Sequence, residues 1–250
     1  MNNKKKAIWG FIGLLLVGFM GNLDYSIVTV ALPSIQEHFN TSLNNIMWVN
    51  LIFSLVGTSI LIPMAKLGDM FGRKKVLLFC LSIFVISSAM CGISPSLPIL
   101  ILGRGLQALG TSALMTISIP LALDIFPHEK RNTIAGIWGG VSGLAVAAGP
   151  SLGGYITEYI NWKYIFFINL PLGLIGFILI FRFIKESFDQ NCNRQIDFIG
   201  SITLAVALST FTYAITKGNE FGFTSKKILI LFIISAISVS YTHLTLPTKA

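Results

Sequence analysis

Long apolar segments separated by short polar connections run through most of this sequence. A helix needs about 20 apolar residues to cross the hydrocarbon core of a bilayer. Segments of roughly that length are Ile8 to Leu32, Ile46 to Met64, Val76 to Ile93, Ile99 to Ile125, Ile134 to Ile156, Tyr164 to Ile184 and Ile196 to Ile215. The pattern predicts an all-α polytopic membrane protein with seven membrane-spanning helices.

An eighth apolar segment, Ile228 to Val239, is shorter than the others. Its 12 residues would form a helix of about 18 Å, against a hydrocarbon core of about 30 Å. The polar stretch SYTHLTLPTKA at 240–250 follows it and has no counterpart elsewhere in the chain. We therefore expect this sequence to be part of a longer protein, with a non-native or disordered tail. A naturally short, re-entrant eighth segment is the alternative.

Composition excludes the main soluble classes. Hydrophobic residues make up 54% of the chain and charged residues 11%, with a mean hydropathy of +0.77. A soluble domain of this composition could not cover its surface with polar groups. The net charge of +8 does not indicate nucleic acid as a partner, because the basic residues lie in short loops and not on one solvated face.

The basic residues also predict an orientation. Of the 18 Lys and Arg residues, 12 fall on the side of the N-terminus and 4 on the other side, while Arg104 lies within a span and Lys249 in the tail. Short cytoplasmic loops carry an excess of Lys and Arg. The N-terminus is therefore expected in the cytoplasm and the chain in the cell membrane as a multi-pass protein.

The most concentrated charge lies in an elbow between the second and third spans, AKLGDMFGRKK (Ala65 to Lys75). Gly68 and Gly72 are expected to let the backbone turn tightly, because a Cβ is absent. Asp69 lies between them and is expected to cap the helix that follows. An ordinary positively charged loop is the simpler interpretation of this stretch.

A second acidic residue lies at the level of the elbow. Asp124 ends the fourth span on the cytoplasmic face, so it is a possible partner for Arg73, beside Lys74. An exposed ion pair contributes only about 0 to 1 kcal/mol. The expected value of such a pair is therefore conformational.

Asp24 lies inside the first span, where an ionisable group is costly and needs a partner. By depth, Asp24 is about 12 Å and Arg104 about 9 Å from the outer face, so the two side chains can meet. Gln107 shares a helix face with Arg104. An arginine beside a carboxylate favours its ionised form, and removing the arginine favours protonation, which is what a proton carrier requires. A static ion pair that fastens two helices is the alternative.

The fifth span carries the sequence GLAVAAGPSLGGYI, in which small residues recur. Gly143, Gly149, Gly153 and Gly154 leave room for a neighbouring helix, and Pro150 permits a kink. Helix packing and a role in gating both explain this pattern. No metal or cofactor is expected, because the three cysteines and three histidines have no metal-like spacing.

These segments together resemble a known family. LDYSIVTVALP, the elbow, LGRGLQALG, GLAVAAGPSLGG and NWKYIFFINLPLG occur in the order in which proton-coupled drug exporters of the major facilitator superfamily carry their signatures. The elbow departs from the family pattern at Ala65 and Met70. The chain is most similar to the fourteen-helix drug:proton antiporter branch, whose extra seventh helix resembles the stretch that begins at Ile196.

The resemblance implies roles for the residues singled out above. Asp24 and Arg104, with Gln107 beside Arg104, would take part in proton coupling. The stretch from Gly143 to Gly154 would be the antiporter-type helix. The cytoplasmic conformational latch would comprise Gly68, Asp69, Gly72, Arg73, Lys74 and Asp124.

The resulting hypothesis is a proton-coupled secondary transporter that exports a small amphipathic molecule through the bilayer, with the proton gradient as its energy source. It divides the chain into a six-helix transporter bundle (1–184), a cytoplasmic linker (185–195) and additional helices (196–239), and it requires a C-terminal bundle that this sequence lacks. The alternatives are a non-transporting membrane fragment with a structural or regulatory role and a polytopic membrane enzyme. The enzyme alternative lacks a recognisable constellation of catalytic residues.

Overall fold

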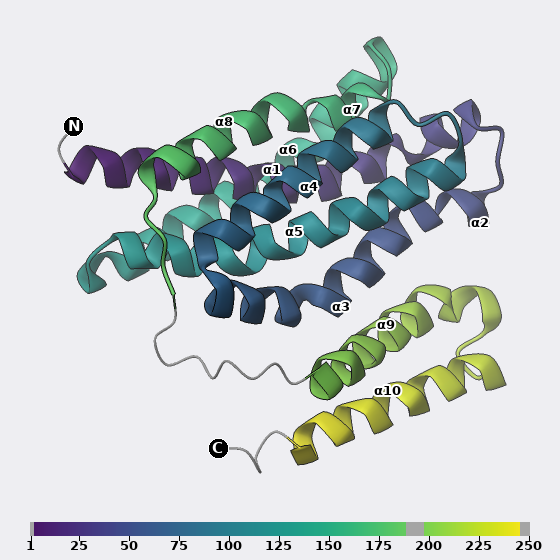
Figure 1. Ribbon diagram of the computed structural model, residues 1–250. Coiled ribbons are helices and arrows are strands. Elements are labelled where there is room, and N and C mark those ends of the chain that lie inside the picture. Colours follow the sequence, from purple (N-terminus) through teal and green to yellow (C-terminus); the bar gives the residue numbers. More distant parts are fainter. Residues whose placement is uncertain (1–2, 189–197, 246–250) are drawn as a thin grey trace.

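The computed structural model describes residues 3–188 and 198–245, and all regular structure within them is helical. The helices are α1 (Asn3–His38), α2 (Leu43–Ile46), α3 (Trp48–Phe71), α4 (Arg73–Gly92), α5 (Leu97–Ile125), the 3-10 helix η1 (His128–Lys130), α6 (Arg131–Tyr159), α7 (Tyr164–Phe167), α8 (Asn169–Phe183), α9 (Phe198–Phe221) and α10 (Lys226–Thr245). They lie roughly along one direction, with α9 and α10 as a hairpin beside α3 (Figure 1).

Six helical segments among the described residues are long and apolar enough to cross a membrane. They are Lys4–His38, Leu43–Phe71, Arg73–Gly92, Leu97–Ile125, His128–Tyr159 and Tyr164–Phe183. These segments confirm the first six predicted spans and the all-α fold. The sixth predicted span consists of α7 and α8, which are separated at Ile168.

The last two helices differ from the prediction in length. The described part of the seventh begins at Phe198 and continues to Phe221, beyond the predicted end at Ile215. Helix α10 has 20 residues and continues to Thr245, a length of about 30 Å, so it extends beyond the predicted apolar segment, which ends at Val239. The helix is longer than its apolar segment because its hydrogen bonds join backbone groups and do not require apolar side chains. Residues 246–250 and most of the predicted linker lie outside the described residues.

The six-helix core holds two apolar clusters. The first lies toward the elbow and is built around Phe11, Leu14, Leu81, Phe84, Leu114, Leu121, Ile180 and Ile184. The second lies toward the opposite end and is built around Ile27, Ile35, Ile46, Val49, Leu100, Trp162 and Phe166. Close packing of these side chains forms the interior of the bundle, because helices in a bilayer associate through van der Waals contacts and not through removal of apolar surface from water. Asp24, Ser88, Arg104, Gln107 and Asn169 lie between the clusters on their helices.

Helices α1 and α6 approach closely where α6 has no side chains. A Cβ added to Gly149 would overlap the Ser26 side chain, and one added to Gly153 would lie 3.0 Å from the Ile27 carbonyl oxygen. The Ser26 hydroxyl donates to the Ala145 carbonyl across the same contact, at 3.5 Å. Small residues at i and i+4 therefore serve helix packing here.

The elbow is shorter and more helical than expected. Gly68 is buried within α3, where an added Cβ would lie 2.7 Å from Ile117 of α5, so its predicted role in the turn is wrong. Gly72 alone makes the turn, with φ of +109°, a conformation that L side chains rarely adopt. The predicted capping role of Asp69 is also wrong, because its carboxylate contacts Arg73 and the N-terminus of α4 has no side-chain cap from within the elbow.

The cap comes from the segment that follows α8. The Glu186 carboxylate accepts hydrogen bonds from the backbone N–H groups of Lys74 at 2.8 Å and Lys75 at 3.2 Å. The Ser187 carbonyl accepts another from the Arg73 N–H at 3.0 Å. A negative charge at a helix N-terminus is stabilised by the unpaired N–H groups and the helix dipole. The first residues of the predicted linker are thus docked on the elbow, not simply solvated.

The hairpin of α9 and α10 packs against α3. The Ser59 and Ser209 hydroxyls share a hydrogen bond, and the Trp48 and Tyr213 rings lie 6.2 Å apart. Within the hairpin, the Ser235 hydroxyl donates to the Ala207 carbonyl at 2.9 Å. Hydrogen bonds of this kind between helices pair polar side chains that would otherwise face lipid.

Replacing Gly149 with alanine should destabilise the bundle, because its Cβ would overlap Ser26. Overpacking of this kind costs about 1 to 3 kcal/mol. Gly143→Ala is the matched control, since nothing lies within 4 Å of its added Cβ and alanine favours a helix. In detergent, the melting temperature should fall for G149A and stay equal or rise for G143A. Equal melting temperatures would contradict the close contact between α1 and α6.

Replacing Glu186 with alanine should also lower the melting temperature, because the N–H groups of Lys74 and Lys75 lose their acceptor. Loss of a helix cap costs about 1 kcal/mol. Glu129→Ala is a suitable control, since Glu129 is an exposed carboxylate in η1, on the same face of the molecule. If E186A and E129A melt alike, the docked segment does not stabilise the elbow.

Candidate functional site

The centre of the bundle holds an ion pair with no exposed surface. Arg104 Nη1 on α5 lies 2.5 Å from Asp24 Oδ2 on α1, and both side chains are 0% exposed. The same Nη1 donates to Gln107 Oε1 at 2.7 Å, and Gln107 Nε2 donates to Asp24 Oδ1 at 2.9 Å. The structure thus brings together the three polar residues that sequence depth placed at one level.

Two further helices contribute to this cluster. Asn169 Nδ2 on α8 donates to Asp24 Oδ1 at 2.8 Å, and the Ser88 hydroxyl on α4 accepts from Gln107 Nε2 at 2.7 Å. Sequence reasoning missed both residues. Asn169 was visible as a polar residue in the apolar run YIFFINLPLG, whereas Ser88 had no distinguishing signal among the serines of its helix.

Aromatic rings cover part of the arginine, whose Nη2 is buried without a hydrogen-bond partner among the described residues. The Arg104 guanidinium carbon lies 4.0 Å from the ring centre of Phe53 and 5.9 Å from that of Phe166. Its Nε donates to the Val49 carbonyl at 3.4 Å. Cation–π contacts contribute most where the cation is desolvated. The charge of Arg104 is therefore balanced by Asp24 and by the ring faces, without solvent.

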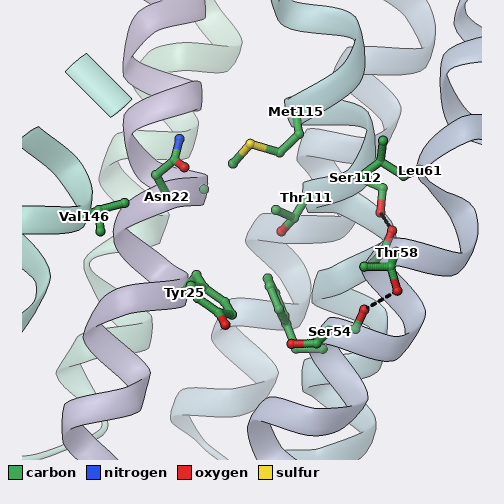
Figure 2. A pocket seen from close by; sticks show the side chains of 12 residues that line it. Asn22, Tyr25, Ser54, Thr58, Leu61, Thr111, Ser112, Met115 and Val146 are labelled. Carbon is green, nitrogen blue, oxygen red and sulfur yellow. Dashed lines mark hydrogen bonds between the residues drawn. The ribbon is translucent and has the colours of Figure 1, made fainter. Parts of the chain in front are cut away.

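An uncharged pocket adjoins this cluster. It has a volume of about 310 Å³ and is lined by Gly21, Asn22, Tyr25, Phe53, Ser54, Gly57, Thr58, Leu61, Thr111, Ser112, Met115 and Val146. Figure 2 shows side chains from opposite helices pointing into it, with Tyr25 and Asn22 on one side and Ser54, Thr58 and Ser112 on the other. The lining combines aromatic and apolar surface with hydroxyl and amide groups, as ligand pockets commonly do.

Phe53 belongs to both sites. Its ring lines the pocket, 6.2 Å from the ring of Tyr25, and also covers the guanidinium of Arg104. A molecule in the pocket would therefore contact the side chain that shields the buried ion pair. The chemistry available is binding of an uncharged or weakly charged aromatic molecule next to a carboxylate whose neighbours control its charge.

The predicted residues of the latch lie together on the face that carries the elbow. Arg73 Nη2 lies 2.7 Å from Asp69 Oδ1, and Arg73 Nη1 lies 2.7 Å from Asp124 Oδ2 on α5. The Ser187 hydroxyl donates to the same Asp124 oxygen at 2.5 Å. The Lys74 side chain extends toward α8 and not toward Asp124, and its Nζ donates to the Phe181 carbonyl at the end of that helix, at 2.8 Å. Gly68 allows α3 to pack closely on α5, and Gly72 makes the turn between α3 and α4.

The five residues of the predicted antiporter motif lie on different faces of α6 and have different neighbours. Gly149 and Gly153 face α1, whereas nothing lies within 4 Å of a Cβ added to Gly143 or Gly154. Pro150 is exposed and lies inside α6, which continues through it. The helix therefore has one face packed on α1 and one face of small residues without a neighbour among the described residues.

Comparison with known proteins identifies the fold family. The family model of the Major Facilitator Superfamily matches residues 14–248. Multidrug resistance protein 3 of Bacillus subtilis (strain 168) is 36% identical over 227 residues, covering 90% of this chain and 44% of that protein. The riboflavin transporter RibZ of Clostridioides difficile (strain 630) is 32% identical over 234 residues, covering 93% of this chain and 51% of that protein.

Solved structures agree on the fold. The human organic anion transporter MFSD10 (TETRAN) matches with a TM-score of 0.63 at 15% identity, covering 97% of this chain and 71% of that chain. A bacterial homologue of the human lysosomal transporter Spinster, in an inward-facing and occupied conformation, matches with a TM-score of 0.58 at 18% identity, covering 91% of this chain and 57% of that chain.

The chain spans about half the length of the curated relatives that it matches, 44% of the first and 51% of the second. Its six candidate membrane spans and helical bundle agree with a multi-pass membrane protein. The family match covers nearly the whole sequence. The chain therefore belongs to the major facilitator superfamily.

Proposed function

We propose that this chain is the N-terminal part of a proton-coupled exporter of small amphipathic molecules, of the fourteen-helix antiporter branch. The observation that carries the proposal is the buried Asp24–Arg104 pair beside an uncharged pocket. Relatives named as multidrug resistance proteins support an exported, drug-like substrate. The excess of basic residues on one side supports a cell-membrane protein with a cytoplasmic N-terminus.

Proton coupling follows from the electrostatics of the pair. While Arg104 contacts Asp24, the ionised carboxylate is favoured, because an opposite charge within a few ångströms stabilises it. A movement of α5 relative to α1 separates the two groups and leaves a buried carboxylate unpaired, which then binds a proton because a buried lone charge is costly. The carboxylate can thus exchange arginine for a proton.

Substrate binding is linked to this exchange through Phe53. An aromatic molecule in the pocket would pack against Phe53 and Tyr25 and could use the hydroxyl groups of Ser54 and Thr58. The absence of a charged side chain among the lining residues favours neutral or weakly charged amphipathic compounds. Displacing the Phe53 ring would weaken the shielding of Arg104, so substrate and proton would influence each other's binding.

Alternating access requires a second bundle. The face of α6 that carries Gly143 and Gly154 has no neighbour among the described residues, and the curated relatives are about twice as long. Secondary transporters of this kind rock one bundle against another around a central site. The latch formed by Arg73, Asp69 and Asp124 joins α3, α4 and α5 on the elbow face, where its opening would accompany that movement.

Replacing Asp24 with Asn should abolish proton-driven transport, because the amide cannot bind or release a proton at this position. The measurement is substrate accumulation driven by a pH gradient in inside-out membrane vesicles that hold the transporter with both bundles. Glu37→Gln, an exposed carboxylate near the end of the same helix, is the control and should retain activity. We expect accumulation with D24N to equal that of vesicles without the protein; undiminished accumulation would disprove the coupling role.

Replacing Phe53 with Leu should weaken binding of aromatic substrates, because the ring that lines the pocket is lost. The expected cost is about 1 kcal/mol, roughly fivefold in Kd. Proton release on substrate binding, measured with a pH indicator in detergent, should also decrease. Phe79→Leu, on an exposed face of α4, should change neither quantity. Unaltered proton release in F53L would show that Phe53 does not link the two sites.

A further inference from the structure

The two oxygens of the Asp24 carboxylate have different partners. Oδ2 contacts Arg104 Nη1 at 2.5 Å, whereas Oδ1 accepts from two amides, Gln107 Nε2 at 2.9 Å and Asn169 Nδ2 at 2.8 Å. One oxygen is therefore held by a charged group and the other by neutral donors. A neutral amide can donate both to a carboxylate oxygen and to the carbonyl oxygen of a protonated acid, and the bond to the ionised oxygen is the stronger of the two.

Ser88 fixes the orientation of both amides. Its hydroxyl oxygen accepts from Gln107 Nε2 at 2.7 Å and from Asn169 Nδ2 at 3.4 Å. Each amide group has two N–H bonds, so one can be directed at Asp24 and the other at Ser88. All three side chains are buried, and hydrogen bonds are stronger in such a low-dielectric environment.

The break between α7 and α8 places Asn169 at this depth. Pro171 has no N–H, so it cannot donate to the carbonyl of Phe167, where α7 ends. The helix resumes at Asn169, whose side chain turns inward to Asp24. In the sequence Asn-Leu-Pro, the proline thus interrupts the helix and the asparagine supplies the amide that contacts Asp24.

We propose that Asn169, oriented by Ser88, is a positioning residue that holds Oδ1 of Asp24 in both protonation states and leaves Oδ2 as the atom that exchanges Arg104 for a proton. This inference rests on the proposed proton coupling. In the exchange, a hydronium ion that reaches the site gives its proton to Oδ2 and leaves as water, and the contact of Nη1 with Oδ2 breaks. Arg104 keeps its charge, and its Nη1 remains hydrogen-bonded to Gln107 Oε1, 2.7 Å away.

Few other charged groups act on Asp24. Arg104 faces it from α5, and the thiol of Cys91 on α4 lies close enough for an electrostatic interaction with both. The charged and titratable side chains of α3, α6, α7 and α8 lie near the ends of those helices. A change at Asn169 therefore acts on Asp24 directly, through the hydrogen bond to Oδ1.

Removal of Asn169 should make Asp24 easier to protonate. A hydrogen bond to the ionised form favours that form, so its loss favours the neutral acid. Asn169→Leu removes the donor at similar volume. Ser88→Ala leaves both amides in place but removes their common acceptor, so it should act in the same direction and more weakly.

The experiment is an infrared pH titration of the chain in lipid, following the C=O stretch of protonated Asp24, assigned by its loss in D24N. In N169L, the midpoint should move upward by about one pH unit, a tenfold change in proton affinity. The band should also move to higher frequency, because the carbonyl oxygen loses a donor. S88A should show a smaller shift, and S87A, whose hydroxyl bonds only to Phe84 within the same helix, should show none.

The outcomes separate this inference from the proposed function. If Asp24 titrates but N169L and S88A leave both midpoint and frequency unchanged, the role of Asn169 is disproved and proton coupling stands. If no Asp24 band is found at any pH at which the protein stays folded, both fail. Should N169L fail to fold, the comparison of S88A with S87A decides the question.

Discussion

The buried ion pair between Asp24 and Arg104 is the constraint on which the rest of the bundle depends. Moving two charges out of water costs several kcal/mol for each ion, and their attraction offsets this only if the remaining polar atoms are also paired. Here Gln107, Asn169 and Ser88 supply partners from three helices, whereas Arg104 Nη2 and Asn169 Oδ1 are buried and have no hydrogen-bond partner among the described residues. The pair therefore fixes the relative positions of α1, α4, α5 and α8.

The same cluster divides the apolar interior. On α1, Met20 belongs to the first apolar cluster and Ile27 to the second, with Asp24 between them. On α4, Phe84 and Cys91 flank Ser88 in the same way. A continuous apolar core would be more stable than one interrupted by polar groups. Under the proposed proton coupling, control of the charge at Asp24 is the use of a polar layer that lowers stability.

Hydropathy and charge were sufficient to predict the first six spans, because length and apolar character are properties of the chain itself. Depth along each helix also placed Asp24 and Arg104 at one level, since the rise per residue is constant. The roles of Gly68 and Asp69 were predicted incorrectly, because the end of α3 depends on contacts with α5 and with Glu186. Asn169 was missed because the face that a residue presents depends on how neighbouring helices pack, and a single sequence does not contain that information.

Helix α5 connects the three parts of the site. It carries Arg104 and Gln107 in the cluster, Thr111 and Ser112 in the pocket, and Asp124 in the latch. Arg104 and Asp124 are 20 positions apart on α5, which corresponds to about 30 Å, the thickness of the hydrocarbon core. Pro120 lies inside α5 between Arg104 and Asp124 and removes one backbone hydrogen bond of the helix. In the proposed mechanism, a displacement of α5 that separates Arg104 from Asp24 would also alter the pocket wall, because Thr111 and Ser112 lie on the same side of Pro120 as Arg104. Because the latch is partly exposed, it adds little stability and can open at low cost. Under the proposed function, proton binding, substrate binding and opening of the elbow face would be linked through this one helix.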